Sequence, residues 1–278
     1  MKGLKGILTL TLLFALSLGI TACNNGGSKD KASGKETIKI GVSEVPHGEI
    51  VNALKDEFAK EGLDVQTVVF DEYTKPNLAL NDKELDANYF QHKPFFEKFS
   101  KEHNLKLEIL GYVHIEPMGV YSKKYKTLDE IPEGSEILIP NDVSNGARAL
   151  LFLEQKGLIK LKDSQNYFST EKDIVENKKN LKFTPLDAAG IPRAYVDVAA
   201  GVINANYALT AGLNPVKESI ALEDLKGPYQ NLVAVREGEK NQEKFKKLIK
   251  VLNSEACKKF IEEKYQLEIG RASCRERV

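Results

Sequence analysis

Apolar and polar positions near the start of the predicted folded region follow a strand, helix, strand order. The segment 37–42 alternates with a period of two and is partly β-branched, which predicts a first strand. The helix expected next has one apolar face, made of Ile50, Val51, Leu54 and Phe58. The segment 65–70 predicts a second strand. Such a unit predicts a parallel sheet with a right-handed crossover.

The same alternation continues along the chain and predicts an α/β protein with two lobes. Further strands are expected at 86–92, 105–113, 136–139, 181–184, 198–203 and 231–236. Further helices are expected after Pro94, from Ser144 to Gly157, and at 192–195, 242–252 and 254–265, whereas 71–80 is expected to be a loop. We expect lobe 1 to comprise 37–119 and 231–267, and lobe 2 to comprise 120–230. Two lobes joined by two crossings place a ligand cleft between them, and such clefts close by hinge motion.

The first 22 residues predict an export signal. Lys2 and Lys5 precede an apolar run that is too short and wrongly flanked for a membrane-spanning helix, and small residues follow it up to Cys23. This order resembles the lipobox of bacterial lipoproteins, which implies that Cys23 becomes the lipidated first residue of the mature chain. An ordinary signal peptide that ends near a cysteine is the alternative. The polar segment 23–36 cannot bury a core and is expected to be a flexible tether.

The last residues, 268–278, show neither a strand period nor a helix period. We predict that they are a non-native tail translated from vector or adapter DNA, and a disordered native tail is the alternative. The signal and the tail hold five of the 40 basic and two of the 40 acidic residues, so the remaining chain has a net charge of −3. Nothing in that charge suggests a nucleic-acid partner. Of the three cysteines only Cys257 remains, which excludes a disulfide framework within the domain.

The segment 139–153 predicts the end of a strand, then a polar turn, and then the start of a helix. Ser144 or Asn145 can cap that helix by accepting its unpaired amide hydrogens. Arg148 then lies in the first turn, where a cation opposes the helix dipole unless an anion is bound nearby. A carboxylate or phosphate pocket is one interpretation, and an arginine that pairs with a surface carboxylate is the other.

Polar and aromatic residues recur at the ends of the predicted strands. The candidate ligand-binding residues are Tyr73, Phe90, His92, His114, Asn145, Arg148, Asn204, Asn206 and Asn231. Each has an ordinary structural explanation, since asparagines cap helices and histidines are often satisfied in cores. Carboxyl ends of strands are where open α/β sheets bind ligands, so their recurrence there favours a binding cleft.

Two other classes of site receive less support. Zinc would suit His47, His92, His114 and Glu116, but none of these has a tight ligand spacing, and Arg148 would repel a cation in the same cleft. An enzyme is not expected, because the chain has no nucleophile elbow, phosphate loop or zinc-protease helix. We therefore predict no catalytic residue, no metal ligand and no cofactor.

Four separated motifs resemble the methionine-binding lipoproteins of ABC importers. They are Asn88–His92, His114–Gly119, Pro140–Asp142 with Arg148–Leu150, and Ile203–Ala208. The resemblance covers nearly all of 38–265 and implies the type II two-lobed periplasmic-binding fold. It implies a lipid anchor at the extracytoplasmic face of the cell membrane, and transfer of methionine to a permease powered by an ATPase. We expect a monomer.

The resemblance also implies roles for the candidate residues. Arg148 is expected to bind the ligand carboxylate, and Asn204 and Asn231 to contact the amino-acid backbone. The expected side-chain pocket consists of Tyr73, Phe90, His92 and His114. Aromatic walls suit a thioether, which is polarizable and a weak hydrogen-bond acceptor.

Some alternatives stay open at this point. The ligand can be L-methionine, D-methionine, a methionine-containing dipeptide or another small amino acid, and a zinc-binding lipoprotein is the alternative of another class. Gly190 and Tyr195 stand where the family usually has glutamine and leucine. Whether they affect ligand preference depends on whether they lie beside the cleft.

Overall fold

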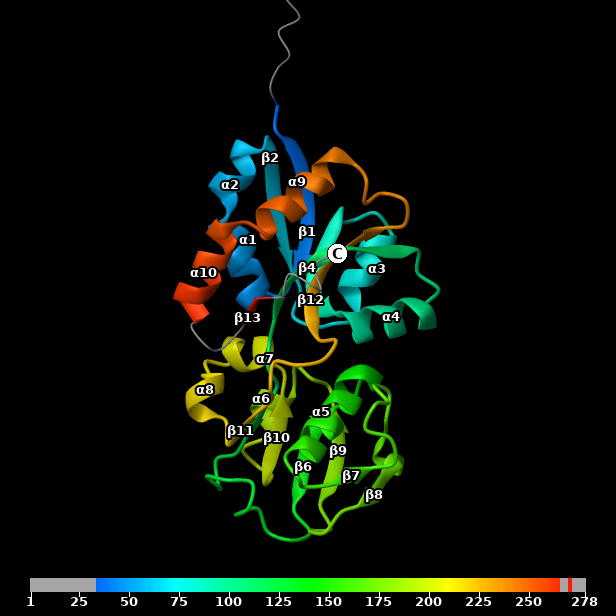
Figure 1. Ribbon diagram of the computed structural model, residues 1–278, viewed down its shortest axis with the longest axis vertical. Helices are drawn as coiled ribbons and strands as arrows, with labels where there is room; N and C mark the ends of the chain where they lie inside the picture. The colour runs from blue at the N-terminus through cyan, green and yellow to red at the C-terminus, as the bar shows by residue number, and fades with distance from the viewer. Residues whose placement is uncertain (1–33, 266–269, 272–278) are drawn as a thin grey trace, which may run out of the picture. The chain divides into compact units, whose positions relative to one another are not determined.

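Two β-sheets organise the residues described by the computed structural model, 34–265 and 270–271. The first sheet has six strands in the order β13-β4-β12-β3-β1-β2, and the second has five in the order β11-β5-β10-β6-β9. Figure 1 shows the two sheets one above the other, each with its own helices. The α/β class and the two lobes are confirmed. The predicted export signal, Cys23 and most of the predicted tether and tail lie outside the described residues.

The first sheet combines parallel and antiparallel strands. Its strands are β1 (Glu36–Val42), β2 (Leu63–Val69), β3 (Ala87–His92), β4 (Leu107–Ile115), β12 (Gln230–Arg236) and β13 (Gly270–Arg271). β1 pairs in parallel with both β2 and β3, so the parallel sheet expected from the first strand, helix, strand unit is confirmed. β12 enters late in the chain and pairs antiparallel with β3 and β4.

Helices cover both faces of the first sheet. They are η1 (Glu44–Gly48), α1 (Glu49–Ala53), α2 (Lys55–Lys60), α3 (Lys75–Asn81), α4 (Lys93–Glu102), α9 (Glu243–Leu252) and α10 (Glu255–Tyr265). Successive residues of a strand point to opposite faces. Along β12, Val233 and Val235 pack in the cluster with α1, α2, α9 and α10, whereas Leu232 and Ala234 pack with α3 and α4. β12 is therefore an internal strand buried on both faces.

Helix α3 corrects the loop expected at 71–80. Pro76 and Asn77 suggested a turn, but proline is well tolerated in the first turn of a helix, where its missing amide is not needed. Ala79 and Leu80 are buried and supply the packing that stabilises this short helix. Only Tyr73 and its immediate neighbours remain in the loop that precedes it.

The second sheet is also covered on both faces. Its strands are β5 (Gly119–Tyr121), β6 (Glu136–Pro140), β9 (Lys182–Leu186), β10 (Ala200–Ile203) and β11 (Ala221–Leu222), and its helices are α5 (Val143–Gln155), α6 (Ile191–Ala194), α7 (Ala205–Thr210) and α8 (Pro215–Glu218). Ile137 and Ile139 pack in the cluster that contains the apolar face of α5. Leu138 between them packs on the other face, with Ile191 and Tyr195. A separate pair, β7 (Lys160–Leu161) and β8 (Ile174–Glu176), follows α5, with η2 (Glu171–Asp173) between its strands.

Two chain crossings connect the sheets. The first runs from the end of β4 at Ile115 to β5, which begins at Gly119, one residue before the predicted start of lobe 2. The second runs from the end of β11 at Leu222 to β12. The backbone amide of Glu223 donates to the Met118 carbonyl at 2.9 Å, so the two crossings lie side by side.

The C-terminal segment contributes one short element to the described residues. Gly270 and Arg271 form β13, which pairs antiparallel with Ile115 and His114 of β4. The absence of a strand period in 268–278 therefore did not exclude a two-residue strand there. The origin of this tail stays a prediction.

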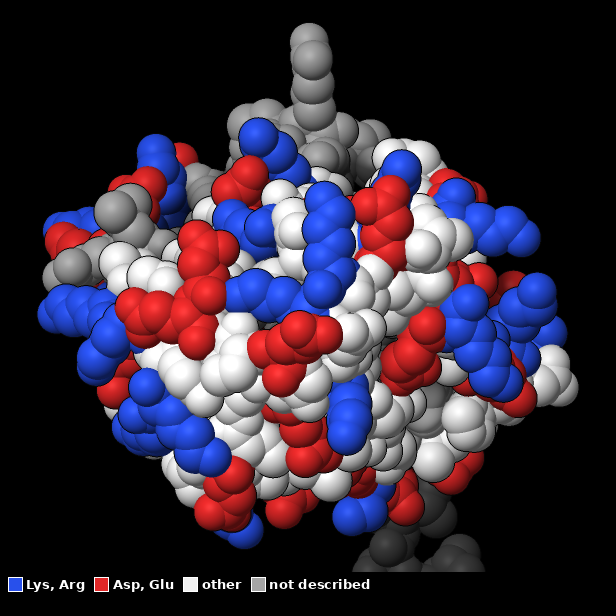
Figure 2. All heavy atoms as spheres, turned by 90° about the horizontal axis from the view of Figure 1, so that it is seen from below, with Lys and Arg blue, Asp and Glu red and all other residues white. Residues whose placement is uncertain are grey.

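The described surface carries charges of both signs. Figure 2 shows lysine and arginine side chains interspersed with aspartate and glutamate over the face seen from the second-sheet end. Within the described residues, no helix combines the length and the apolar character needed to cross a membrane.

Candidate functional site

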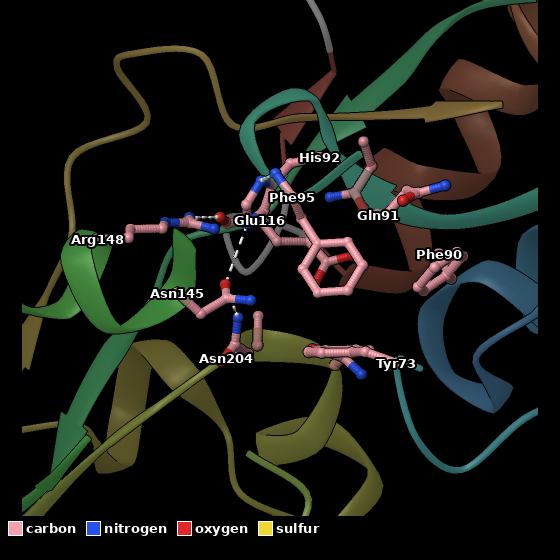
Figure 3. A pocket seen from close by; sticks show the side chains of 12 residues that line it. Tyr73, Phe90, Gln91, His92, Phe95, Glu116, Asn145, Arg148 and Asn204 are labelled. Atoms are coloured by element: carbon pink, nitrogen blue, oxygen red, sulfur yellow. Dashed lines mark hydrogen bonds between the residues drawn. The ribbon is translucent and has the colours of Figure 1, made fainter. Parts of the chain in front are cut away.

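A cavity lies between the two sheets and is lined by residues of both. Its empty space is about 350 Å³, a volume that includes open solvent. Its lining residues are Tyr73, Phe90, Gln91, His92, Phe95, Glu116, Asn145, Arg148, Asn204, Ala205, Asn206 and Asn231. Figure 3 shows these side chains converging from β3, α4, the first crossing, α5 and the start of α7. Eight of the nine candidate ligand-binding residues are among them.

His114 is the candidate that does not line the cavity. It is fully buried in β4, and its Nε2 lies 2.7 Å from Oε1 of Glu116. Its Nδ1 pairs with the hydroxyl of Tyr89. His114 therefore contacts the cavity wall from behind, through Glu116, and is not among the residues that line the cavity.

Four lining residues were not among the candidates. Phe95 was interpreted as core because it shares an apolar helix face, and Glu116 was considered only as a metal ligand. Gln91 and Ala205 carried no signal of their own. The side chain of Gln91 is held by hydrogen bonds to Asn77 and Asn88, so it supports the wall of the cavity.

The start of α5 sets the position of Arg148. Asp142 caps the helix by accepting the Asn145 amide at 2.9 Å, which corrects the expected cap at Ser144 or Asn145 and moves Arg148 into the second turn. A Cβ on Gly146 would lie 2.9 Å from the Pro140 carbonyl oxygen. Glycine at this position therefore lets α5 approach the end of β6 closely.

Arg148 is held by a buried carboxylate rather than by a surface one. Its Nε lies 3.0 and 3.1 Å from the two carboxylate oxygens of Glu223, and its Nη2 donates to Glu223 Oε2 at 2.6 Å. Nη2 also donates to the Glu116 carbonyl at 2.6 Å, and the Tyr229 ring lies 4.2 Å from the guanidinium carbon. Both side chains of the pair are about 95% buried, with 4% and 5% exposed. Within the described residues Nη1 has no hydrogen-bond partner.

His92, Asn145 and Asn204 form a hydrogen-bonded chain across the cleft, drawn with dashed lines in Figure 3. Oδ1 of Asn145 accepts from His92 Nε2 at 3.0 Å and from Asn204 Nδ2 at 2.8 Å. His92 Nδ1 accepts the Phe95 amide, so the proton of the neutral ring is on Nε2. Burial and the nearby Arg148 lower the pKa of His92 to about 3, which keeps the ring neutral.

Asn204 leaves one acceptor without a donor. Its Oδ1 is buried and has no hydrogen-bond partner within the described residues, although the residue lines the cavity. A buried acceptor that stays unpaired is costly, so this oxygen suits a ligand that brings a donor.

Glu116 is a buried anion supported from the side of the first lobe. Burial raises its pKa, but the adjacent His47 and the hydrogen bond from His114 lower it, and its pKa lies below the ordinary value. His47 Nε2 lies 3.4 Å from Glu116 Oε1 and 3.0 Å from Asn231 Oδ1. Burial lowers the pKa of His47 to about 4, so this ring is neutral near pH 7.

Three of the four candidate zinc ligands come together in this cluster. The ligand atoms of His47, His114 and Glu116 lie within 4.8 Å of one another, whereas His92 pairs with Asn145. Each Nε2 of the two histidines faces an oxygen acceptor and must carry a proton to donate to it. A metal ligand needs a deprotonated nitrogen. The cluster therefore fits hydrogen bonding to an ionised carboxylate better than it fits zinc.

An aromatic wall closes another side of the cavity. The Tyr73 ring lies 6.1 Å from Phe90, 5.7 Å from Phe95 and 4.8 Å from Tyr207 between ring centroids. The Tyr73 hydroxyl donates to Asn206 Oδ1 at 2.5 Å, which connects the two lobes across the cleft. Gly190 and Tyr195, the two departures from the family pattern, do not line this cavity.

Comparisons with known proteins agree with this geometry. The family model described as NlpA lipoprotein matches residues 38–272. The methionine-binding lipoprotein MetQ of Bacillus subtilis (strain 168) is 41% identical over 261 residues, which are 92% of this chain and 94% of that protein.

Two solved structures extend the likeness to the fold. A nutrient binding protein from Burkholderia cenocepacia bound to methionine is 44% identical with a TM-score of 0.82, and covers 85% of this chain and 100% of its own. An ABC transporter, periplasmic substrate-binding protein from Coxiella burnetii is 37% identical with a TM-score of 0.81, and covers 84% of this chain and 100% of its own. The expected two-lobed fold of periplasmic binding proteins is thereby confirmed.

The buried neutral His47 makes a prediction about acid stability. The unfolded chain protonates this histidine below the ordinary pKa of 6.5, whereas the folded chain does so only near 4. Stability is therefore lost as the pH falls through that window, by up to about 3 kcal/mol from this group. In His47→Gln, the free energy of unfolding of ligand-free protein should fall less steeply between about pH 6.5 and pH 4.

The measurement is urea denaturation at a series of pH values. The matched control is His103→Gln, because His103 is exposed in the folded chain whereas His47 is buried. Equal slopes in wild type and His47→Gln would show that His47 does not stay neutral in the fold.

Proposed function

The chain belongs to the NlpA lipoprotein family, and from this premise we propose that it captures methionine outside the cytoplasm and delivers it to an ABC importer. The observation that supports this most is the distribution of groups around the cavity. One part offers a guanidinium together with a carboxylate, and another part offers aromatic rings. A free amino acid with an apolar, polarizable side chain matches both parts.

The polar part suits an α-amino acid zwitterion. The Nη1 of Arg148, which has no partner within the described residues, would donate to the ligand carboxylate. Glu116 and the unpaired Oδ1 of Asn204 would accept from the ligand ammonium group. Asn231 lines the cavity with its Oδ1 already engaged by His47, so its Nδ2 is the group that it offers to the carboxylate.

The aromatic part suits a thioether. Tyr73, Phe90 and Phe95 present ring faces and edges, and sulfur makes favourable contacts with aromatic rings. No charged side chain is needed there to hold an uncharged ligand side chain. A methionine-containing dipeptide is the alternative ligand.

The proposal extends to the lipid anchor in the membrane and to the transport partner. We expect Cys23 to carry the lipid that holds the protein at the extracytoplasmic face of the membrane, and the polar segment after it to serve as the tether. The partner is the importer permease with its ATPase. No residue is assigned a catalytic role.

Methionine should stabilise the folded protein. A ligand at about 100 times its Kd adds about 2.7 kcal/mol to the free energy of unfolding, which raises the Tm of a domain of this size by about 5 to 11 °C. Differential scanning fluorimetry of ligand-stripped protein should show this shift with L-methionine and not with leucine or glutamate. D-methionine and a glycyl-methionine dipeptide should be scanned in parallel to rank the alternatives.

Mass spectrometry of the ligand released from freshly purified protein provides an independent check. Methionine should be the main species. A dipeptide would support the alternative ligand class, and the absence of any thermal shift with methionine would contradict the proposal.

Replacing Arg148 by lysine should weaken methionine binding by about 1.5 to 3 kcal/mol. Lysine keeps a positive charge opposite Glu223, but it lacks the planar fork that bonds to Glu223 and to a ligand at the same time. Arg193→Lys is the matched control, because Arg193 is exposed and does not line the cavity. Isothermal titration calorimetry should separate the two variants, and equal affinities would remove Arg148 from the binding site.

A further inference from the structure

We infer that Glu223, which does not line the cavity, determines the charge type of the accepted ligand by neutralising Arg148. The cleft then binds a zwitterion and rejects a carboxylate that lacks a cationic group. This inference rests on the proposed function and adds a specificity-determining residue to it. Glu223 acts through Arg148 and does not itself contact the ligand.

The contacts of Glu223 fix its carboxylate firmly against the guanidinium. Both of its oxygens lie within 3.1 Å of Arg148 Nε, and Oε2 also accepts from Nη2. Oε2 accepts the Met118 amide at 2.8 Å as well, and the backbone of Glu223 donates back to the Met118 carbonyl. The side chain is only 5% exposed, so solvent screens the pair weakly. These contacts hold the Glu223 carboxylate against the guanidinium of Arg148.

The balance of charges around the cavity follows from this pairing. Arg148 contributes one positive charge and Glu223 cancels it, whereas Glu116, which accepts a hydrogen bond from His114 Nε2 at 2.7 Å, remains as an ionised carboxylate in the wall. His47 and His92 are neutral, since burial lowers the pKa of His47 to about 4 and that of His92 to about 3. Burial raises the pKa of Asp142, whose two carboxyl oxygens accept hydrogen bonds from Asn145 Nδ2.

This charge balance has a consequence for ligand choice. An unpaired arginine attracts any carboxylate, because its full charge acts on the ligand. When Glu223 cancels that charge, a carboxylate gains directed hydrogen bonds from Nη1 but little net attraction, and it is repelled by Glu116. A ligand ammonium group removes that repulsion, so the site distinguishes methionine from its analogue without the amino group.

The test compares L-methionine with 4-(methylthio)butanoate, which keeps the thioether and the carboxylate and lacks the amino group. Calorimetry on the ligand-stripped full chain gives the ratio of the two dissociation constants for wild type and for Glu223→Gln. Glutamine keeps the size and one acceptor oxygen but removes the charge. We expect the preference for methionine over the analogue to fall about tenfold in Glu223→Gln.

The ratio of the two dissociation constants distinguishes the loss of the Glu223 charge from a displacement of Arg148. A variant that only misplaces Arg148 weakens both ligands alike and leaves the ratio unchanged, which would overturn the inference. Asp224→Asn is the matched control, because Asp224 is the next residue, its side chain is 62% exposed, and its nearest cation lies 3.8 Å away. Its ratio should equal that of wild type.

A second measurement on wild type keeps the inference testable if Glu223→Gln does not fold. With Arg148 neutralised and Glu116 ionised, 3-(methylthio)propylamine should bind more tightly than 4-(methylthio)butanoate. Equal binding of the amine and the acid would overturn the inference while leaving methionine binding intact. Wild type that does not bind methionine at all would instead contradict the proposed function.

Discussion

The ion pair between Arg148 and Glu223 is the interaction on which the arrangement of the cleft depends. Burying two opposite charges costs several kcal/mol per ion, and their attraction offsets this only when further hydrogen bonds satisfy both groups. Here Arg148 also donates to the Glu116 carbonyl and lies over the Tyr229 ring. Glu223 also accepts a hydrogen bond from the Met118 amide. These groups come from both chain crossings, whereas Arg148 comes from α5 of the second sheet. The pair therefore connects the two crossings to the guanidinium that lines the cavity.

The first lobe supplies the opposite charge. Glu116 lies at the start of the first crossing, directly after β4, and two buried imidazoles approach its Oε1 from behind. Because burial keeps His47 neutral near pH 7, the carboxylate of Glu116 gains no cation from that ring. A ligand ammonium group would supply a cation opposite this carboxylate. The unpaired Oδ1 of Asn204 reaches the same cavity from the second lobe, so acceptors of both lobes line one cavity.

Part of this site could be predicted from sequence because local pattern carries it. The strand, polar turn and helix around Arg148 and the asparagines after predicted strands pointed to residues that the structure places around one cavity. Glu223 could not be found in the same way, since it lies 75 residues from Arg148 and its segment has no strand or helix period that points to a site. His114 was misplaced because a position at a strand end does not say which face of the sheet it occupies. Helix α3 was missed because Pro76 can equally start a helix or form a turn.

The central claim is that the cleft holds a zwitterion between Arg148 and the pair of acceptors formed by Glu116 and Asn204. A crystal structure of the protein with L-methionine tests it most directly. The ligand carboxylate should lie within hydrogen-bond distance of Arg148 Nη1, its ammonium group within the same distance of Glu116 and of Asn204 Oδ1, and its sulfur among Tyr73, Phe90 and Phe95. A ligand bound in the reverse orientation, or a carboxylate that makes no contact with Arg148, would contradict it.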